Sequence, residues 1–156
     1  MGYRLQVVGL ALGITSQTFC EFEKSQVFLR TNTLRFKDST VTNSTNGLRI
    51  KTDYNATGSV VNVTFANIAL SNIKNYGIDV QQDYRNGGPT GIASNGVLVA
   101  NISFENVKGW VVPAAADYYV LCGDGSCEDF EFKDVDVWGG GRNSTCNYPA
   151  QGCPGP

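Results

Sequence analysis

The sequence predicts an all-β protein, built as a right-handed parallel β-helix of about four coils with a disulfide-bonded C-terminal end. Three observations support this fold class. A short phrase recurs four times along the 156 residues. Eighteen glycines and many Asn, Thr, Ser and Val residues favour turns and short strands. Helical periodicity is interrupted by Gly or Asn wherever it begins.

The recurring phrase consists of an apolar residue, a polar residue, Phe, a spacer, and then Asn or Asp. Its phenylalanines are 29, 39 and 28 residues apart, and a repeat in this range is typical of stacked coils. In register they would form an aromatic ladder inside the coils, with the Asn or Asp where each strand turns. The phrases occupy residues 34–38, 63–67, 102–106 and 130–134, and their aromatic residues are Phe36, Phe65, Phe104 and Phe132.

Each coil is expected to contain two strands. Within the phrases apolar and polar residues alternate, which directs Val61, Val63 and Phe65 to one face, followed by Ile68 and Leu70. A second strand follows at residues 47–51 and 77–81, and the Gly/Pro-rich segment 84–91 explains the longest interval. An antiparallel sandwich of short strands is the alternative, and the repeat favours the β-helix.

Residues 1–30 do not resemble the coils, which we assign to residues 31–156. Arg4 followed by the apolar stretch 5–14 loosely resembles a signal peptide. Two other interpretations stay open for this segment: a buried strand, or a start that does not belong to the original gene. We expect the chain to be a truncated β-helix.

Composition excludes several classes of function. The net charge is −2 without a basic run, so nucleic acid is not an expected partner. No run of 18 apolar residues is present, so a membrane span is not expected. Histidine is absent, which excludes a Ser-His-Asp or Cys-His centre within this chain. We expect no cofactor and no metal site.

Cysteines and glycosylation motifs indicate a secreted, extracellular protein. Two close cysteine pairs lie in Gly-containing loops that can close disulfides, whereas a zinc site would need two-residue knuckles or histidines. Metal binding or free thiols remain the alternative for the cysteines, and chance occurrence remains the alternative for the sequons. We expect disulfides Cys122–Cys127 and Cys146–Cys153 with Cys20 unpaired, and candidate glycosylation at Asn43, Asn55, Asn62, Asn101 and Asn143.

Several further motifs point to one family. They are Asn-Gly-Leu-Arg-Ile-Lys-Thr at 46–52, Tyr-Gly-Ile-Asp-Val-Gln-Gln-Asp-Tyr at 76–84, Pro-Thr-Gly at 89–91 with Asn-Gly-Val at 95–97, and the ending at 120–127, 139–141 and 144–146. In order and spacing the stretch from Thr33 to Cys153 resembles the C-terminal portion of the polygalacturonases, family 28 of the glycoside hydrolases. The fungal endo-acting enzymes are the most similar group.

The resemblance implies pectin, or polygalacturonate, as the partner. Arg49 and Lys51 are separated by one residue, so on a strand they face the same side, where arginine can meet a sugar carboxylate with a bidentate fork. The alternative is a solvated face on which they pair with Asp53 or Asp79. The resemblance implies that Tyr84 lines the substrate cleft, and strand alternation would place Gln82 on the same face as Tyr84.

The catalytic part of the family pattern is missing from these 156 residues. The resemblance assigns the acids of an inverting hydrolase to an Asn-Thr-Asp segment and an Asp-Asp pair, near a Gly-His-Gly, and none of these occurs here. We therefore name no catalytic residue. The expected function is that of the C-terminal part of a polygalacturonase, monomeric and inactive on its own. The alternative is a non-catalytic secreted β-helix that binds acidic glycan.

Overall fold

The computed structural model describes residues 3–6, 21–24, 33–85 and 88–155. Within these ranges every regular element is a β-strand. Cys20 and much of the segment 1–30 lie outside the described residues. No helix in the described part of the chain has the length and apolarity that crossing a membrane requires.

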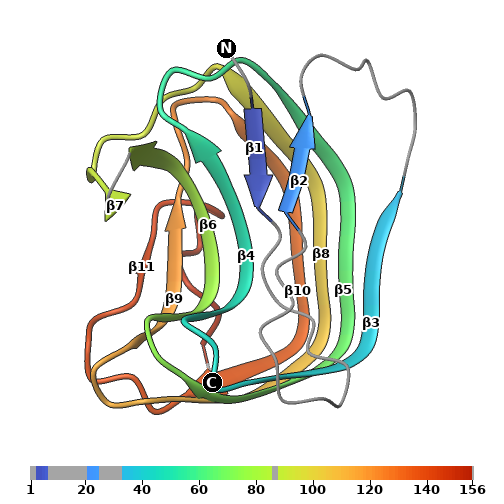
Figure 1. Ribbon diagram of the computed structural model, residues 1–156, viewed down its shortest axis with the longest axis vertical. Helices are drawn as coiled ribbons and strands as arrows, with labels where there is room; N and C mark the ends of the chain where they lie inside the picture. Colours follow the sequence, from blue (N-terminus) through green and yellow to red (C-terminus); the bar gives the residue numbers. More distant parts are fainter. Residues whose placement is uncertain (1–2, 7–20, 25–32, 86–87, 156) are drawn as a thin grey trace.

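Four coils follow one another, and each consists of one longer, bent strand followed by one shorter strand (Figure 1). The two-stranded β1–β2 ladder is antiparallel, and β7 pairs antiparallel with the end of β6. The coils comprise β3 (Leu34–Thr42) and β4 (Asn46–Asp53), β5 (Gly58–Ile73) and β6 (Tyr76–Arg85), β8 (Val97–Val111) and β9 (Ala116–Leu121), and β10 (Cys127–Trp138) and β11 (Thr145–Cys146). Outside the coils lie β1 (Tyr3–Gln6), β2 (Glu21–Lys24) and β7 (Gly88–Pro89).

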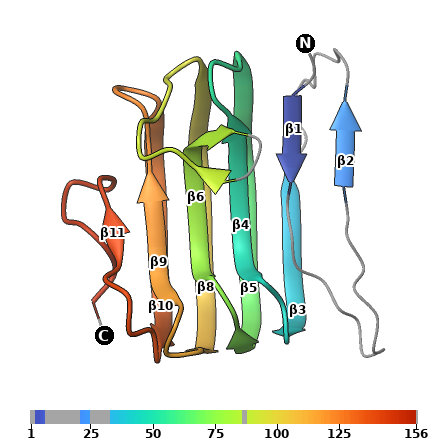
Figure 2. The same cartoon turned by 60° about the vertical axis from the view of Figure 1, so that its left-hand side comes forward.

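The strands form two parallel sheets that face each other across the core. The long strands lie in the order β10-β8-β5-β3 and the short strands in the order β11-β9-β6-β4. Figure 2 shows the coils stacked side by side, from the coil of β3 and β4 on the right to the coil of β10 and β11 on the left. The parallel β-helix predicted from the repeat is confirmed, and the antiparallel sandwich is wrong for these coils.

The phenylalanine ladder lies where the repeated phrase predicts it. Phe65 is in register with Phe36 on one side and with Phe104 on the other. Ring centroids are 5.3 Å apart from Phe36 to Phe65, 5.3 Å from Phe65 to Phe104 and 4.9 Å from Phe104 to Phe132. The excursion at 84–91 leaves this register intact, because Gly88 and Pro89 fold back antiparallel onto Tyr84 and Arg85 instead of lengthening the coil.

The inward positions follow a spacing of three and two residues rather than a simple alternation. In β5 the buried residues are Val60, Val63, Phe65, Ile68, Leu70 and Ile73. Asn62, Asn67 and Asn72 between them have positive φ angles of 59°, 56° and 56°. Each left-handed residue turns the strand and takes one extra position. The expectation that Val61 faces the core is therefore wrong, and Val60 takes that place.

Asparagine tolerates the left-handed conformation better than other residues with a side chain, and here it also links the coils. The Asn106 amide donates to Asn67 Oδ1 at 3.0 Å, and the Asn67 amide donates to Asp38 Oδ1 at 2.8 Å. These are the residues that end the first three phrases, so their predicted position at the strand turn is confirmed.

Two stacked glycines allow the coils to approach closely where the short sheet begins. A Cβ atom at Gly47 would lie 2.3 Å from the Gly77 carbonyl oxygen, and one at Gly77 would lie 2.6 Å from the Asp117 carbonyl oxygen. Only glycine fits such contacts. These glycines fix the height at which β4 and β6 start, and hence the register of the side chains that follow.

Candidate binding face of the short sheet

The short strands direct one set of side chains into the core and the other set to the opposite side of the sheet, where Lys51, Asp79 and Gln81 are also buried. Ile50, Val80 and Val120 are in register across the sheet and at most 1% exposed, in the core. The next outward positions form a row across β4, β6 and β9, in which Arg49 pairs with Asp79 and Asp79 with Tyr119. We call the outward side chains the binding face: Arg49, Lys51, Asp79, Gln81, Tyr84 and Tyr119.

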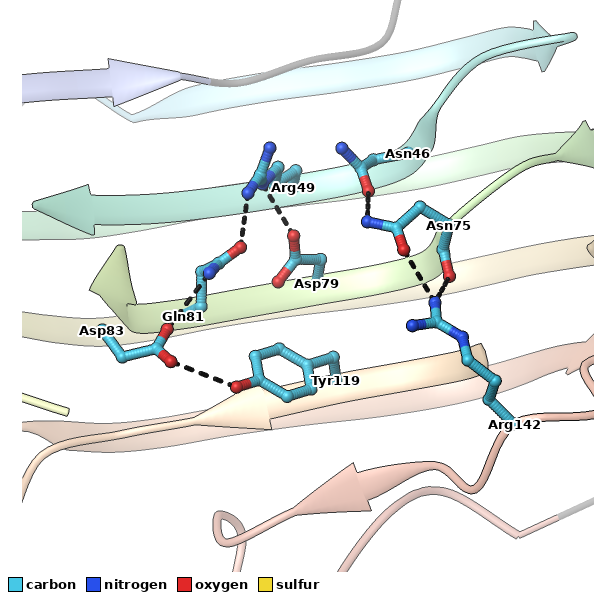
Figure 3. A network of polar contacts seen from close by, with 8 residues as sticks. All are labelled: Asn46, Arg49, Asn75, Asp79, Gln81, Asp83, Tyr119 and Arg142. Carbon is cyan, nitrogen blue, oxygen red and sulfur yellow. Dashed lines mark hydrogen bonds and ion pairs between the residues drawn. The ribbon is translucent and has the colours of Figure 1, made fainter. Parts of the chain in front are cut away.

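Arg49 is held at two points on this face (Figure 3). Its Nε atom lies 2.7 Å from Asp79 Oδ2, and its Nη2 atom donates a hydrogen bond to Gln81 Oε1. The Arg49 side chain is 11% exposed and that of Asp79 is 0% exposed. The alternative that Arg49 pairs with Asp79 is thus confirmed, although the pair is buried rather than solvated.

Tyr84 lies close to both cations of the face. Lys51 Nζ is 3.5 Å from the centroid of the Tyr84 ring, and Arg49 Cζ is 5.6 Å from it. Both distances fall in the range of cation–π attraction. Lys51 is only 3% exposed, and the ring of Tyr84, itself half-buried, lies over its ammonium group. The structure therefore brings Arg49, Lys51 and Tyr84 together, as the sequence motifs suggest.

Asp83 connects the face to the turn that follows β6. Its Oδ1 accepts from the Gln81 amide at 3.1 Å, and its Oδ2 accepts from the Gly91 backbone N–H at 2.7 Å and the Tyr119 hydroxyl at 3.2 Å. Burial, followed by the charge of Asp83, raises the pKa of Tyr119 far above its usual 10. Tyr119 therefore stays a hydrogen-bond donor at any physiological pH.

A second polar cluster lies at the start of the same strands. The Arg142 Nη2 atom donates to the backbone oxygen and to Oδ1 of Asn75, and the Asn75 amide donates to Asn46 Oδ1 at 3.4 Å. The Arg142 Cζ atom also lies 4.8 Å from the centroid of Tyr76, which stacks on Tyr119. Sequence reasoning missed Arg142, because it reaches Asn75 from 67 residues away.

Asp79 has an unusual protonation equilibrium. Burial raises the pKa of its carboxyl group from 3.8 to about 7, although the charge of Arg49 lowers it. Among the described residues, its carboxylate forms one ion pair, between Oδ2 and Arg49 Nε at 2.7 Å. Desolvation that this single contact does not offset favours the neutral acid.

The stability of the folded chain is expected to reflect this group. The folded state keeps the Asp79 proton up to a pH of about 7, whereas the unfolded state releases it near 3.8. Because the folded state binds more protons in this window, Asp79 makes stability fall as the pH rises from about 4 to 7, by at most about 1.4 kcal/mol per pH unit. Asp79→Asn should lack this component.

Urea denaturation between pH 4.5 and 7.5 would measure the difference between the two proteins. Asp134→Asn, which removes a carboxylate whose side chain is 60% exposed, is the matched control and should keep the wild-type profile. Parallel profiles for wild type and Asp79→Asn would contradict the expectation.

Gln82 does not lie where strand alternation predicts. It is 0% exposed and its side chain points into the molecule. Its amide donates to the Val97 carbonyl at 2.6 Å, and its Oε1 accepts from the Gly123 N–H at 3.0 Å and the Ser126 hydroxyl at 2.6 Å. The expected shared face with Tyr84 is wrong, because the ladder between β4 and β6 shifts register after Lys51. Gln81 takes the position on the binding face.

Both predicted disulfides are present. Cys122 bonds to Cys127 with Cα atoms 5.9 Å apart, and Cys146 bonds to Cys153 with Cα atoms 5.0 Å apart. The prediction that Cys20 is unpaired falls outside the described residues. The described residues also contain no group of three or more His, Cys, Asp or Glu side chains that could hold a metal ion.

The five sequons fall into two structural groups, and their glycosylation stays a prediction. Asn43, Asn62 and Asn101 form side-chain hydrogen bonds between coils; for example, the Asn101 amide donates to Asn62 Oδ1 at 2.6 Å. Asn55 and Asn143 are exposed outside the strands.

Comparison with known proteins identifies the family of the chain. Residues 25–154 match the family model of the glycosyl hydrolases family 28. The chain is 58% identical over 119 residues to endopolygalacturonase D of Aspergillus niger, a match that covers 76% of this chain and 24% of that protein. It is 54% identical over 121 residues to a polygalacturonase of Fusarium fujikuroi, covering 78% of this chain and 32% of the relative. The chain thus spans about a quarter to a third of the length of these curated relatives.

Proposed function

The chain belongs to glycosyl hydrolase family 28, and from this premise we propose that it is the C-terminal part of a polygalacturonase. Such an enzyme hydrolyses the α-1,4 linkages between the galacturonate units of pectin. Secretion to the extracellular space is part of the proposal. It is supported by the two disulfides, which persist in oxidising compartments, and by the sequons.

The observation that carries the proposal is the pair of cations around one tyrosine. Each galacturonate unit has one carboxylate, and a guanidinium group binds a carboxylate through charge-assisted hydrogen bonds. Arg49 and Lys51 supply two positive charges within 5.6 Å and 3.5 Å of the Tyr84 ring centroid. The ring offers an apolar surface to a sugar, and its hydroxyl can form hydrogen bonds.

In this proposal the chain contributes substrate binding rather than proton transfer. An inverting glycosidase needs an acid and a base roughly 6.5–9.5 Å apart on either side of the bond. Asp79 and Asp83, the two carboxyl groups beside the binding face, are both 0% exposed, and neither belongs to a catalytic motif of the family resemblance. We assign them no catalytic role.

Titration with trigalacturonate tests the proposal. Arg49→Ala and Lys51→Ala should each weaken binding about tenfold, because each removes a positive charge from the face that the anionic sugar approaches. Binding by the wild type should also weaken with added salt, since the ligand is a polyanion. In a reducing-sugar assay, the 156-residue chain alone should release no product from polygalacturonate.

The matched control is Lys108→Ala, which removes an exposed cation on the opposite sheet, where Lys108 pairs with Asp134 at 2.9 Å. It should bind trigalacturonate like the wild type. Salt-insensitive binding that survives the loss of both Arg49 and Lys51 would contradict the proposed face, and robust hydrolysis by this chain would contradict its non-catalytic role.

A further inference from the structure

The Asp79 carboxylate is buried, and one of its two oxygens forms an ion pair with Arg49. Its Oδ2 lies 2.7 Å from Arg49 Nε, and this ion pair is the one contact of the carboxylate within the described residues. Asp83, equally buried, accepts three hydrogen bonds, from Gln81, the Gly91 N–H and Tyr119. The two acids therefore differ in their contacts: the Asp83 carboxylate accepts three hydrogen bonds, whereas the Asp79 carboxylate contacts Arg49 alone among the described residues.

Among the described residues, the charges around Asp79 balance closely. Arg49 and Lys51 on β4 contribute two positive charges, and Asp79 and Asp83 on β6 contribute up to two negative ones. On β9 the neighbouring titratable group is Tyr119, a neutral donor to Asp83. The proton on Asp79 thus decides whether this group of charges is neutral or carries a net charge of +1.

We propose that Asp79 is a positioning residue of the binding face, which orients the Arg49 guanidinium and takes up a proton when an anionic sugar binds there. The inference rests on the proposed function and adds a linkage to it. A sugar carboxylate bound at Arg49 places a negative charge next to the Asp79 carboxyl group, and a neighbouring like charge disfavours the ionised form of that group. Uptake of one proton by the Asp79 carboxylate yields the neutral acid and removes that repulsion.

The same linkage makes affinity depend on pH. Burial raises the pKa of Asp79 to about 7, so the proton is exchanged near neutrality. A galacturonate carboxyl group, like an ordinary carboxyl group, stays ionised above about pH 5. Acidification from pH 8.5 to 5.5 therefore changes the protein and not the ligand. Acidification should tighten binding about threefold to tenfold, the effect expected when one of two neighbouring negative charges is neutralised in a partly screened site.

Calorimetric titration of trigalacturonate provides the test, with wild type, Asp79→Asn and the control Asp134→Asn. Asparagine keeps the shape of Asp79 and cannot ionise. In buffers of different ionisation enthalpy at pH 7, the wild type and the control should take up about 0.3–0.4 proton per ligand, the amount that a threefold to tenfold linkage gives at the midpoint of the Asp79 titration. Asp79→Asn should take up almost none, and its affinity should change less than twofold from pH 5.5 to 8.5.

The outcomes separate the inference from the proposed function. If Asp79→Asn binds with the proton uptake and pH profile of the wild type, the inference is overturned while the function stands. If the wild type does not bind at any pH, the proposed function fails and the ligand linkage with it. The ligand-free titration of the Asp79 carboxyl carbon, followed by NMR, is independent of binding. A midpoint near 7 supports the inference and a midpoint near 4 overturns it.

Discussion

Replacing Phe104 by alanine should lower the free energy of unfolding by about 3–5 kcal/mol, the range for losing a buried phenylalanine. Phe104 is 1% exposed and stacks on Phe65 and Phe132 at once, with centroid distances of 5.3 Å and 4.9 Å. The substitution removes both ring contacts and leaves a cavity between coils that the neighbouring backbone, fixed by the parallel ladders, cannot close. Urea denaturation followed by circular dichroism measures the loss.

Leu98→Ala on the same strand is the control, because Leu98 is 37% exposed and its loss should change stability by less than about 0.5 kcal/mol. Phe104→Leu keeps part of the volume and should fall between the two. Equal effects for Phe104→Ala and Leu98→Ala would show that the ladder contributes little to stability.

The fold could be predicted because one phrase carries two physical requirements together. The Phe fills the space between coils, and the Asn or Asp two residues later adopts the left-handed turn that bends the strand, as at Asn67 with φ 56° and Asn106 with φ 49°. What the phrase did not show is that further left-handed residues, such as Asn62, interrupt the alternation between phrases. That is why Val60, and not Val61, faces the core.

The binding face could be predicted only in part. Arg49 and Lys51 are two residues apart on one strand, so local geometry was sufficient to place them on one face. The partner Asp79 could be found by aligning Gly47 with Gly77, because the glycines start successive strands at the same height. Arg142 could not be found in this way, since its position depends on a loop and on the stacking of three coils.

Gln81 and Gln82 offer the sharpest contrast between stability and binding, because neighbouring residues of one type point in opposite directions. Both are 0% exposed. Gln82 holds Val97 and the loop closed by Cys122–Cys127, whereas Gln81 holds Arg49 and Asp83 on the binding face. The same substitution at the two positions should therefore have different consequences.

Gln82→Ala should lower the free energy of unfolding by about 3–5 kcal/mol. The substitution leaves the Val97 carbonyl, the Gly123 N–H and the Ser126 hydroxyl without this partner in the interior, and an unsatisfied buried group costs about 1–3 kcal/mol. Affinity for trigalacturonate should change less than twofold where the variant is folded.

Gln81→Ala should weaken binding more than Gln82→Ala does, because Arg49 loses its hydrogen bond to Gln81 Oε1. It should also lower the stability of the fold less. Urea denaturation and calorimetric titration of both variants measure these effects. A Gln82→Ala protein with wild-type stability and reduced affinity would show that Gln82 acts in ligand binding and not in holding the interior together.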